Sequence, residues 1–460
     1  MTHEELEQLS KDELIEVILR QQAIVAHLAW WLSTLKAQVK ALSKPAKTSD
    51  NSSVPPSKGH KANRKRDKPA RKRGPKPGHV GRSRSRQKPD VVIECRRKVC
   101  QGCGADLSQA GHKQVGSSQI VEIPPIKPVV IEARRYEVEC PLCGKKQAAD
   151  YPAGLESERV FGPHLEALIS YLHQVHHLSY ERLEEVFAEV FGLSISQGAL
   201  SNSVHRTGKR LLSQAEMIKE DICRSPVIGS DETGARVDGH NEWQWVFQTP
   251  QACYHVIVPS RAAAVIAQVL GPAEPEVWVS DLFSAQKKHP AKEHQICHAH
   301  QLRDLQYAID AERCAFAYRM QRLLLRAKGL ATHRDTLPDE IYRWQVRDIE
   351  QACDDLLQCP VSSEQGRKMQ RRFLKYRDCL FIFLYRADVP FDNNASERDL
   401  RNSVVHRKVS GGFRSRWGAE TFATVATVVG TARKRGKQIL ATLQEAIGPP
   451  IPVTLVYQPP

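Results

Sequence analysis

The chain has 460 residues, of which 41% are hydrophobic and 26% charged, and its net charge is +15. These proportions are typical of a globular protein with two to four domains, and they exclude a collagen, a fully disordered chain and a small disulfide scaffold. No apolar stretch reaches the roughly 18 residues of a membrane-spanning helix, and no basic stretch followed by an apolar one marks a secretory signal. We therefore expect a cytoplasmic protein without a membrane partner.

Residues 1–43 predict a helix with a heptad repeat. Ser10 and Glu13 have the spacing of a capping box, and Pro45 ends the apolar pattern. Such a helix either packs on its own domain or forms a coiled coil. Because a linker-like segment follows, we expect a homo-oligomer that forms through a coiled coil. The repeat positions are Leu14, Ile18, Gln21, Val25, Leu28, Leu32, Leu35, Val39 and Leu42.

Residues 44–90 are rich in Ser, Pro, Lys and Arg, and they predict a basic, disordered linker. Residues 58–88 contain 14 Lys or Arg and one acid, Asp67, so most of the net charge of the chain lies there. The segment is either a solvated linker or an arm that binds a polyanion, and we favour an arm that binds DNA. The candidate contacts are Lys65, Arg66, Arg71, Lys72 and Arg73.

Residues 91–152 predict a zinc-binding domain. Two C-x2-C pairs, Cys100 with Cys103 and Cys140 with Cys143, provide four thiolates for a tetrahedral structural Zn2+ site. The alternating segment 129–133 is expected to form a strand between them. The other cysteines are scattered, which suits a reducing compartment and a metal site better than disulfides.

Residues 158–215 have apolar residues at helical spacing, and Ser196 is placed to cap a helix from Gly198 to Leu212. Two helices joined by a short glycine-containing turn fit a DNA-binding helix-turn-helix. They fit a plain helical hairpin equally well, and the pattern leaves both interpretations open.

From residue 224 to 300 the periodicity changes to that of strands. Three hairpin-connected strands followed by alternating helix and strand are typical of a ribonuclease H-like core, in which the first and fourth strands are neighbours. Asp231 and Asp281 each end one of these strands, so we expect them to lie close enough to share metal ions. The expected strands are 227–231, 243–247, 254–258 and 277–280 with a short one near Ile296, and the expected helices are 262–270 and 285–293.

The segment 390–398 offers a third acid. Asp392 or Asn393 can cap a helix, which places Glu397 in its first turns. Taken singly, each acid is more often a solvated residue or a cap. As a triplet on this order of elements, Asp231, Asp281 and Glu397 favour a metal site.

Two further groups have alternative interpretations. One is a His- and Cys-rich cluster that is either another metal site or a hydrogen-bonded corner, and we favour the corner. The other is a basic segment that is either a solvated face or a set of phosphate contacts, and we favour phosphate contacts. The cluster comprises His289, His294, Cys297, His298 and His300, and the basic segment comprises Arg398, Arg401, Arg407, Lys408, Arg414 and Arg416.

Taken together, the sequence resembles the DDE transposases of the insertion sequence 66 family. The resemblance rests on the heptad, the phrase 51–57, the paired C-x2-C motifs, the helical region, the phrases 230–233 and 297–300 and, above all, Asp-Asn-Asn-Ala-Ser-Glu-Arg at 392–398. It implies that Asp231, Asp281 and Glu397 are catalytic and hold two Mg2+ or Mn2+ ions. It also implies that 301–388 is a helical insertion, that 389–445 completes the core and that 446–460 is a tail.

The expected fold class is therefore multidomain α+β, with a coiled-coil helix, a four-cysteine zinc module, a helical region and a ribonuclease H-like core that carries a helical insertion. The resemblance implies a bacterial, nucleoid-associated transposase that cuts double-stranded DNA at element ends and joins it to target DNA, with accessory proteins of the element as candidate partners. A non-catalytic DNA-binding regulator derived from a transposase is the alternative, and a nuclease without strand joining is a third interpretation.

Overall fold

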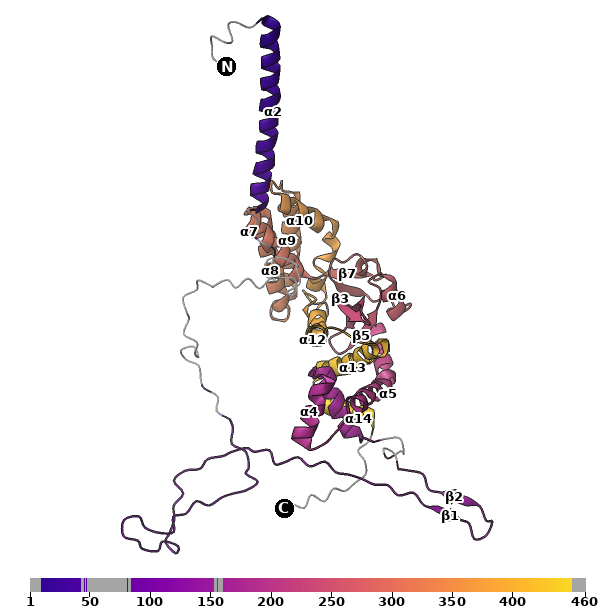
Figure 1. Ribbon diagram of the computed structural model, residues 1–460. Coiled ribbons are helices and arrows are strands. Elements are labelled where there is room, and N and C mark those ends of the chain that lie inside the picture. Colours follow the sequence, from indigo (N-terminus) through magenta and orange to yellow (C-terminus); the bar gives the residue numbers. More distant parts are fainter. Residues whose placement is uncertain are drawn as a thin grey trace. The chain divides into compact units, whose positions relative to one another are not determined.

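A computed structural model describes residues 10–42, 45, 47, 81, 84–152, 155 and 160–448. The chain divides into two compact units, one of Met1–His60, Ala133–Glu184 and Ser196–Pro460, the other of Lys61–Glu132 and Glu185–Ile195. The described part is multidomain α+β, with 13 α-helices, a five-stranded mixed sheet and a small hairpin (Figure 1). None of these helices is long and apolar enough to cross a membrane. The arm residues Lys65, Arg66, Arg71, Lys72 and Arg73, and most of the tail 446–460, lie outside the described residues.

The N-terminal helix α2 (Lys11–Leu42) begins with the expected capping box. The backbone N–H and the hydroxyl of Ser10 both donate to Glu13 Oε2, at 2.8 and 2.7 Å. These hydrogen bonds lower the pKa of the Glu13 carboxyl. Most of the described apolar positions of the repeat are exposed, with Leu28 at 60% and Val39 at 62%, whereas Leu14 is half-buried.

The zinc-binding segment has little regular structure. Strands β1 (Glu137–Glu139) and β2 (Lys146–Ala148) form an antiparallel hairpin. The strand expected at 129–133 is wrong, because this segment is irregular and its Val130 is 93% exposed. An isolated apolar run forms a strand only where a neighbouring strand or a packed layer supports it.

The sheet is built from β3 (Val227–Val237), β4 (His240–Gln248), β5 (Cys253–Val258), β6 (Val277–Ser280) and β7 (Glu293–Ile296). Its strand order is β5-β4-β3-β6-β7. The first three strands pair antiparallel, whereas β6 runs parallel to β3 and to β7. The first and fourth strands of the series are therefore neighbours, as expected.

Two expectations about these elements need correction. The first strand does not end at Asp231 but continues to Val237, so this aspartate lies within β3. The helix expected at 285–293 is wrong, because only the 3-10 turn Gln286–Lys288 forms there before β7. Pro290 interrupts this segment, since proline has no amide hydrogen to continue a helix. The helix expected at 262–270 is present as α6 (Ala264–Leu270).

The helical segment that precedes the sheet in the chain packs against it in one hydrophobic core. It comprises α3 (Pro163–Ser170), the π-helical turn η1 (Tyr171–Val175), α4 (Tyr180–Phe191) and α5 (Gln197–Cys223). Ser196 caps α5 as expected, accepting from the N–H of Ala199 at 3.3 Å. Leu211 and Ile222 of α5 pack in one buried cluster with Trp245 and Trp278 of the sheet.

A second buried cluster belongs to the helices between β7 and residue 388. They are α7 (His298–Glu312), α8 (Ala315–Thr332), α9 (Asp339–Gln358), α10 (Glu364–Lys375) and the short α11 (Ile382–Tyr385). Their core includes Val277, Val279 and Ile296 from the sheet.

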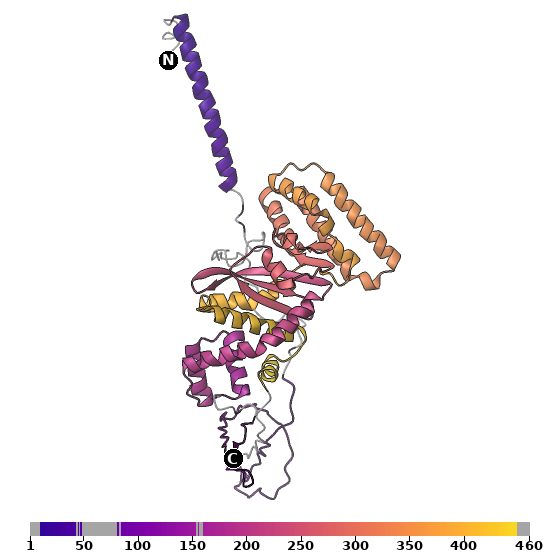
Figure 2. The ribbon, with the colours of Figure 1, turned by 90° about the vertical axis from the view of Figure 1, so that its right-hand side faces the viewer.

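The chain continues with α12 (Asn394–Ser410), α13 (Arg416–Lys434) and α14 (Ile439–Ile447). Figure 2 shows the gold helices α12 and α13 along one face of the sheet, where α12 contacts β3 and β4 and α13 contacts β5.

Candidate active site

The first two acids lie where two parallel strands separate. The pairing of β3 with β6 ends at Gly229 opposite Val279, two residues before Asp231 and Asp281 respectively. Asp281 directly follows β6. Burial and the nearby negative charges of Asp281 and Glu232 raise the pKa of Asp231 well above its usual range. The strand geometry thus brings the two aspartates together, as the sequence predicts.

The third acid is placed by the hydrogen bonds at the start of α12. Asp392 Oδ1 accepts from the N–H of Asn394 at 3.1 Å, which starts the helix. The buried side-chain amide of Asn393 donates to the carbonyl oxygen of Ser230 at 2.7 Å, and its Oδ1 accepts from the hydroxyl of Ser396 at 2.7 Å. Glu397 lies in the first turn of this helix. The phrase 392–398 therefore ties the third acid to the residue that precedes Asp231.

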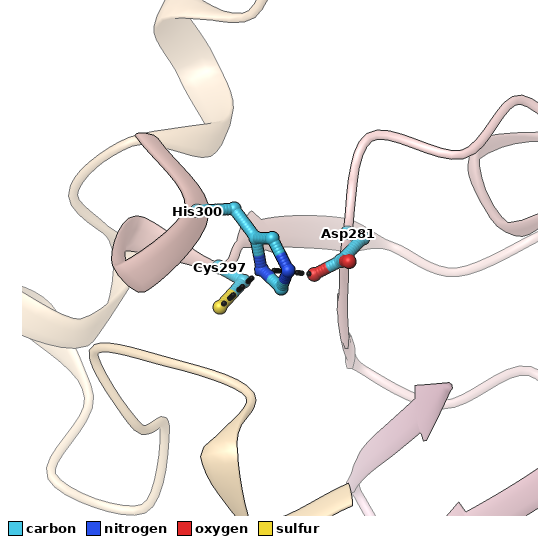
Figure 3. A group of neighbouring side chains, drawn as sticks. All are labelled: Asp281, Cys297 and His300. Atoms are coloured by element: carbon cyan, nitrogen blue, oxygen red, sulfur yellow. Dashed lines mark hydrogen bonds and ion pairs between the residues drawn. The ribbon is translucent and has the colours of Figure 1, made fainter. Parts of the chain in front are cut away.

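His300 connects the second and third acids. Its Nδ1 lies 2.9 Å from Asp281 Oδ1, and its Nε2 lies 3.6 Å from Glu397 Oε1. Nδ1 also lies 3.5 Å from the sulfur of Cys297. Figure 3 shows the imidazole ring of His300 between Cys297 and Asp281. Burial alone would lower the pKa of His300, but the hydrogen bonds to Asp281 and Cys297 raise it to about 11. The imidazolium acts on Asp231 as well, where its charge opposes the rise in pKa. Two of the three predicted acids thus contact His300.

The structure divides the His- and Cys-rich cluster into two parts. Cys297 and His300 lie with Asp281, and their ligand atoms are all within 4.8 Å of one another; this is the one such group of three among the described residues. His298 instead forms the expected hydrogen-bonded corner, where it is fully buried and contacts the carbonyl oxygen of Leu380 at 2.6 Å. His289 packs against Trp278. The sequence pattern did not reveal that Asp281 joins two members of this cluster.

Glu232 is a further residue that the sequence analysis did not single out. Its side chain is 3% exposed, and it pairs with Arg261 at 2.6 Å and accepts from Gln286 at 2.6 Å. The guanidinium of Arg261 lies over the rings of Trp243 and Phe283. Burial raises the pKa of Glu232. These contacts fix the backbone beside Asp231. In the sequence, the only sign that Glu232 belongs to the site is that it directly follows Asp231.

A pocket of about 400 Å³ opens beside Asp281 and His300. Arg372 reaches into its lining and binds Asp304 at 2.6 Å and Gln301 at 3.1 Å. The pocket gives polar molecules and ions access to Asp281.

The basic residues after Glu397 fall into two groups. Arg398, Arg401, Lys408 and Arg414 are exposed. Arg407 donates to the carbonyl oxygen of Gly234, and Arg416 pairs with the buried Glu242. The guanidinium groups of Arg407 and Arg416 therefore stabilise the sheet, which the sequence pattern did not indicate.

The four predicted zinc ligands lie in two loops of the same local geometry. In the first, Gly104 N–H donates to Cys100 O at 3.0 Å and Cys100 N–H donates to Ala105 O at 2.9 Å. Gly144, Cys140 and Lys145 repeat this pattern at 2.9 and 3.0 Å. Both glycines have φ near +70°, which explains why glycine follows each cysteine pair.

Hydrogen bonds within each loop favour the thiolate form of its first cysteine. Backbone hydrogen bonds from Cys103 and Gly102 lower the pKa of Cys100, and those from Cys143 and Leu142 lower the pKa of Cys140. Zinc binds the thiolate, so both loops are suited to provide two ligands. The two loops belong to different units of the chain.

Comparisons with known families agree with this arrangement. The family model described as "Transposase IS66 family" matches residues 158–421, more than half of the chain and all three acids. The model described as "zinc-finger binding domain of transposase IS66" matches residues 97–144, which contain the four paired cysteines. The protein is thus a transposase with a zinc-finger domain, and so a DNA- and metal-binding protein. It belongs to the IS66 family of transposases.

One curated relative is similar over a short segment. It is the "Uncharacterized protein y4jO" of Sinorhizobium fredii, 37% identical over 81 residues. The match covers 18% of this chain and spans about a quarter of the relative.

Proposed function

We propose that this chain is a DDE transposase whose sheet and helices α5, α12 and α13 form a ribonuclease H-like core. It cleaves DNA strands at the ends of its insertion sequence and joins them to target DNA. The observation that carries the proposal is the convergence of Asp281 and Glu397 on His300, near the half-buried Asp231.

The three carboxylates fit Mg2+ or Mn2+, which prefer oxygen ligands. Burial and the charge of Asp281 disfavour an ionised Asp231 without a cation, as its raised pKa indicates. Asp231, Asp281 and Glu397 would hold two such ions. Bound there, the ions would activate a water or 3′-hydroxyl nucleophile and stabilise the leaving oxygen.

Basic residues near the acids orient the Glu397 carboxylate and supply positive charge for phosphate contacts. Arg303, on the same helix as His300, lies 3.6 Å from Glu397 and restrains its carboxylate. The exposed Arg398, Arg401, Lys408 and Arg414 are suited to contact phosphates, which positions DNA without reading its sequence. Arg407 and Arg416 support this surface through their contacts with the sheet.

The other parts of the chain supply binding and assembly in this proposal. A structural Zn2+ joins Cys100 and Cys103 to Cys140 and Cys143. The basic arm and the exposed face of α5 are candidate DNA contacts, and the helix-turn-helix interpretation remains a prediction. The apolar repeat of α2 forms a homo-oligomer, and accessory proteins of the element remain candidate partners.

Strand transfer tests the proposal. Full-length protein is incubated with pre-cut element ends and target DNA in Mg2+ or Mn2+, and joined products are compared for wild type, Glu397→Gln and the exposed control Glu420→Gln. We expect joining by wild type and by the control, and a loss of about 10²-fold or more in Glu397→Gln, because one carboxylate ligand of the ions that stabilise the transition state is removed.

Three outcomes separate the interpretations. Equal joining by wild type and Glu397→Gln would contradict the assignment of this acid. Binding without joining by any variant, with the element's accessory proteins added, would instead support the regulator. Strand hydrolysis without joining would support the nuclease.

A further inference from the structure

The sulfur of a buried cysteine lies next to the three-carboxylate site, which uses only oxygen ligands. Cys297 Sγ, His300 Nδ1 and an oxygen of Asp281 are all within 4.8 Å of one another (Figure 3). Mg2+ and Mn2+ prefer carboxylate and water oxygens, whereas a thiolate with an imidazole suits Zn2+ and similar ions. The cysteine is therefore not a ligand in the oxygen-ligated site proposed above.

We propose that Asp281, Cys297 and His300 form a second divalent-cation site, selective for thiophilic ions such as Zn2+, that shares Asp281 with the catalytic acids. Cys297 and His300 come from the start of α7, and Asp281 from the end of β6. Binding removes the proton of the Cys297 thiol and the Nδ1 proton of the His300 imidazolium, and both protons pass to solvent.

The distances fit a tetrahedral ion. An ion about 2.3 Å from sulfur and about 2.0 Å from nitrogen places these two ligand atoms about 3.5 Å apart. The observed separation of Cys297 Sγ and His300 Nδ1 is 3.5 Å. Nδ1 lies 2.9 Å from Asp281 Oδ1, so a small opening of this contact admits the ion. On its other side, His300 Nε2 faces Glu397, and a carboxylate behind the imidazole is the usual second partner of a metal-bound histidine.

The fold holds the sulfur of Cys297 in place. The residue is the N-cap of α7. Its sulfur also accepts from the backbone N–H of Asn393 at 3.1 Å. Cys297 is fully buried, but Asp281 and His300 line the pocket of about 400 Å³ beside it, which provides a path for the ion.

Occupation of this site has a consequence that rests on the proposed function. An ion bound by Cys297 and His300 takes Asp281 away from the oxygen-ligated ions. We therefore expect Zn2+ to inhibit strand transfer by competing with Mg2+ for this carboxylate.

Cobalt spectroscopy tests the site without reference to activity. The full chain, with its zinc finger already loaded with Zn2+, is titrated with Co2+, and the near-ultraviolet absorption of a cobalt–thiolate bond is recorded. We expect the band in wild type, its loss in Cys297→Ser and an affinity weaker by at least about 10–100-fold in His300→Gln, since loss of a direct ligand should cost no less than loss of the partner behind one. Serine keeps a hydrogen-bond acceptor for Asn393, and circular dichroism verifies that the variants are folded.

Cys353→Ser, a buried cysteine within α9, is the matched control and should keep the band. Absence of the band in wild type, or its persistence in folded Cys297→Ser, would overturn the proposal. His300→Gln provides an independent second test, because an unchanged cobalt affinity in this variant would also overturn it.

Inhibition is measured separately. The ratio of strand transfer with and without added Zn2+, in constant Mg2+, should be lower for wild type than for Cys297→Ser. Equal ratios would overturn the competition for Asp281. If wild type joins no DNA at all, the proposed function fails, while the cobalt result still decides whether the metal site exists.

Discussion

The side-chain amide of Asn393 donates a hydrogen bond of 2.7 Å to the carbonyl oxygen of Ser230. Ser230 precedes Asp231 on β3, and Asn393 immediately precedes α12, which carries Glu397. The hydroxyl of Ser396 donates to the other end of the same amide and fixes its orientation. One buried side chain thus determines how far two of the three acids lie from each other.

Asn393→Asp should therefore impair the site more than its small change in shape suggests. The carboxylate cannot donate to Ser230, and a buried acceptor would then face a carbonyl oxygen. We expect a loss of about 1–3 kcal/mol in the free energy of unfolding, measured by denaturant titration. Strand transfer should fall further than this loss explains, under conditions where the variant is fully folded.

Asn394→Asp is the matched control, because residue 394 begins α12 and an acid is favourable in a first helical turn. Equal effects of the two substitutions would show that the hydrogen bond to Ser230 does not position the site.

The zinc finger should lose its metal when one loop is broken. Cys140→Ser removes a thiolate from the second loop, so we expect zinc content to fall by about one ion per chain, measured by metal analysis of purified protein. Cys95→Ser, outside both loops, should keep the zinc of wild type. Zinc content that is unchanged in Cys140→Ser would contradict the four-cysteine site.

Local patterns in the sequence predicted much of this arrangement. The strands of the sheet, the caps at Ser10 and Ser196 and the proximity of Asp231 and Asp281 all follow from periodicity, cap chemistry and strand order. The helix expected at 285–293 fails because Pro290 and strand pairing outweigh a short helical pattern. The contact of His300 with Asp281 could not be predicted, because it depends on how β6 and β7 pair and where α7 then begins.

Stability should decrease in acid through the buried His255. Burial, with a smaller effect of the Lys434 charge, lowers the pKa of His255 to about 3, whereas in the unfolded chain it is about 6.5. Between these values only the unfolded chain binds the proton, so the free energy of unfolding falls as the pH decreases below 6.5. The loss from this one group is about 2 kcal/mol between pH 7 and pH 5.

Denaturant titrations across this range check the contribution. His255→Gln should show a shallower decrease than wild type, whatever its stability at pH 7. His240→Gln, on the exposed start of β4, should retain the wild-type slope. If the free energy of unfolding of His255→Gln depended on pH as it does in wild type, His255 would not be the cause of the loss of stability in acid.

The exposed repeat of α2 should hold copies of the chain together. Leu28 and Leu35 are 60% and 48% exposed on the isolated helix, and a coiled coil would bury them. We expect the double variant Leu28→Asp and Leu35→Asp to be smaller than wild type by sedimentation, because two carboxylates would enter an apolar seam. The pair Gln22→Asp and Gln38→Asp, outside the repeat, should leave the wild-type assembly unchanged. Equal sedimentation of wild type and the leucine variant would exclude this helix as the interface.

The basic arm should control the salt dependence of DNA binding. Lys65, Arg66, Arg71, Lys72 and Arg73 lie in its densest part, and removing one phosphate-binding charge lowers the slope of log K against log salt by about 0.9. Substitution of all five by Gln should therefore weaken binding and flatten the slope by as much as about 4–5.

The matched control exchanges Lys for Arg and Arg for Lys at the same five positions, which keeps the charge. This variant should retain the wild-type slope, because counterion release depends on charge rather than on side-chain shape. Deletion of residues 58–88 should flatten the slope at least as much as the five substitutions. A slope unchanged by both the neutral substitutions and the deletion would make the segment a linker. DNA affinity would then have to come from the other candidate contacts, which are the exposed Arg and Lys after Glu397 and the exposed face of α5.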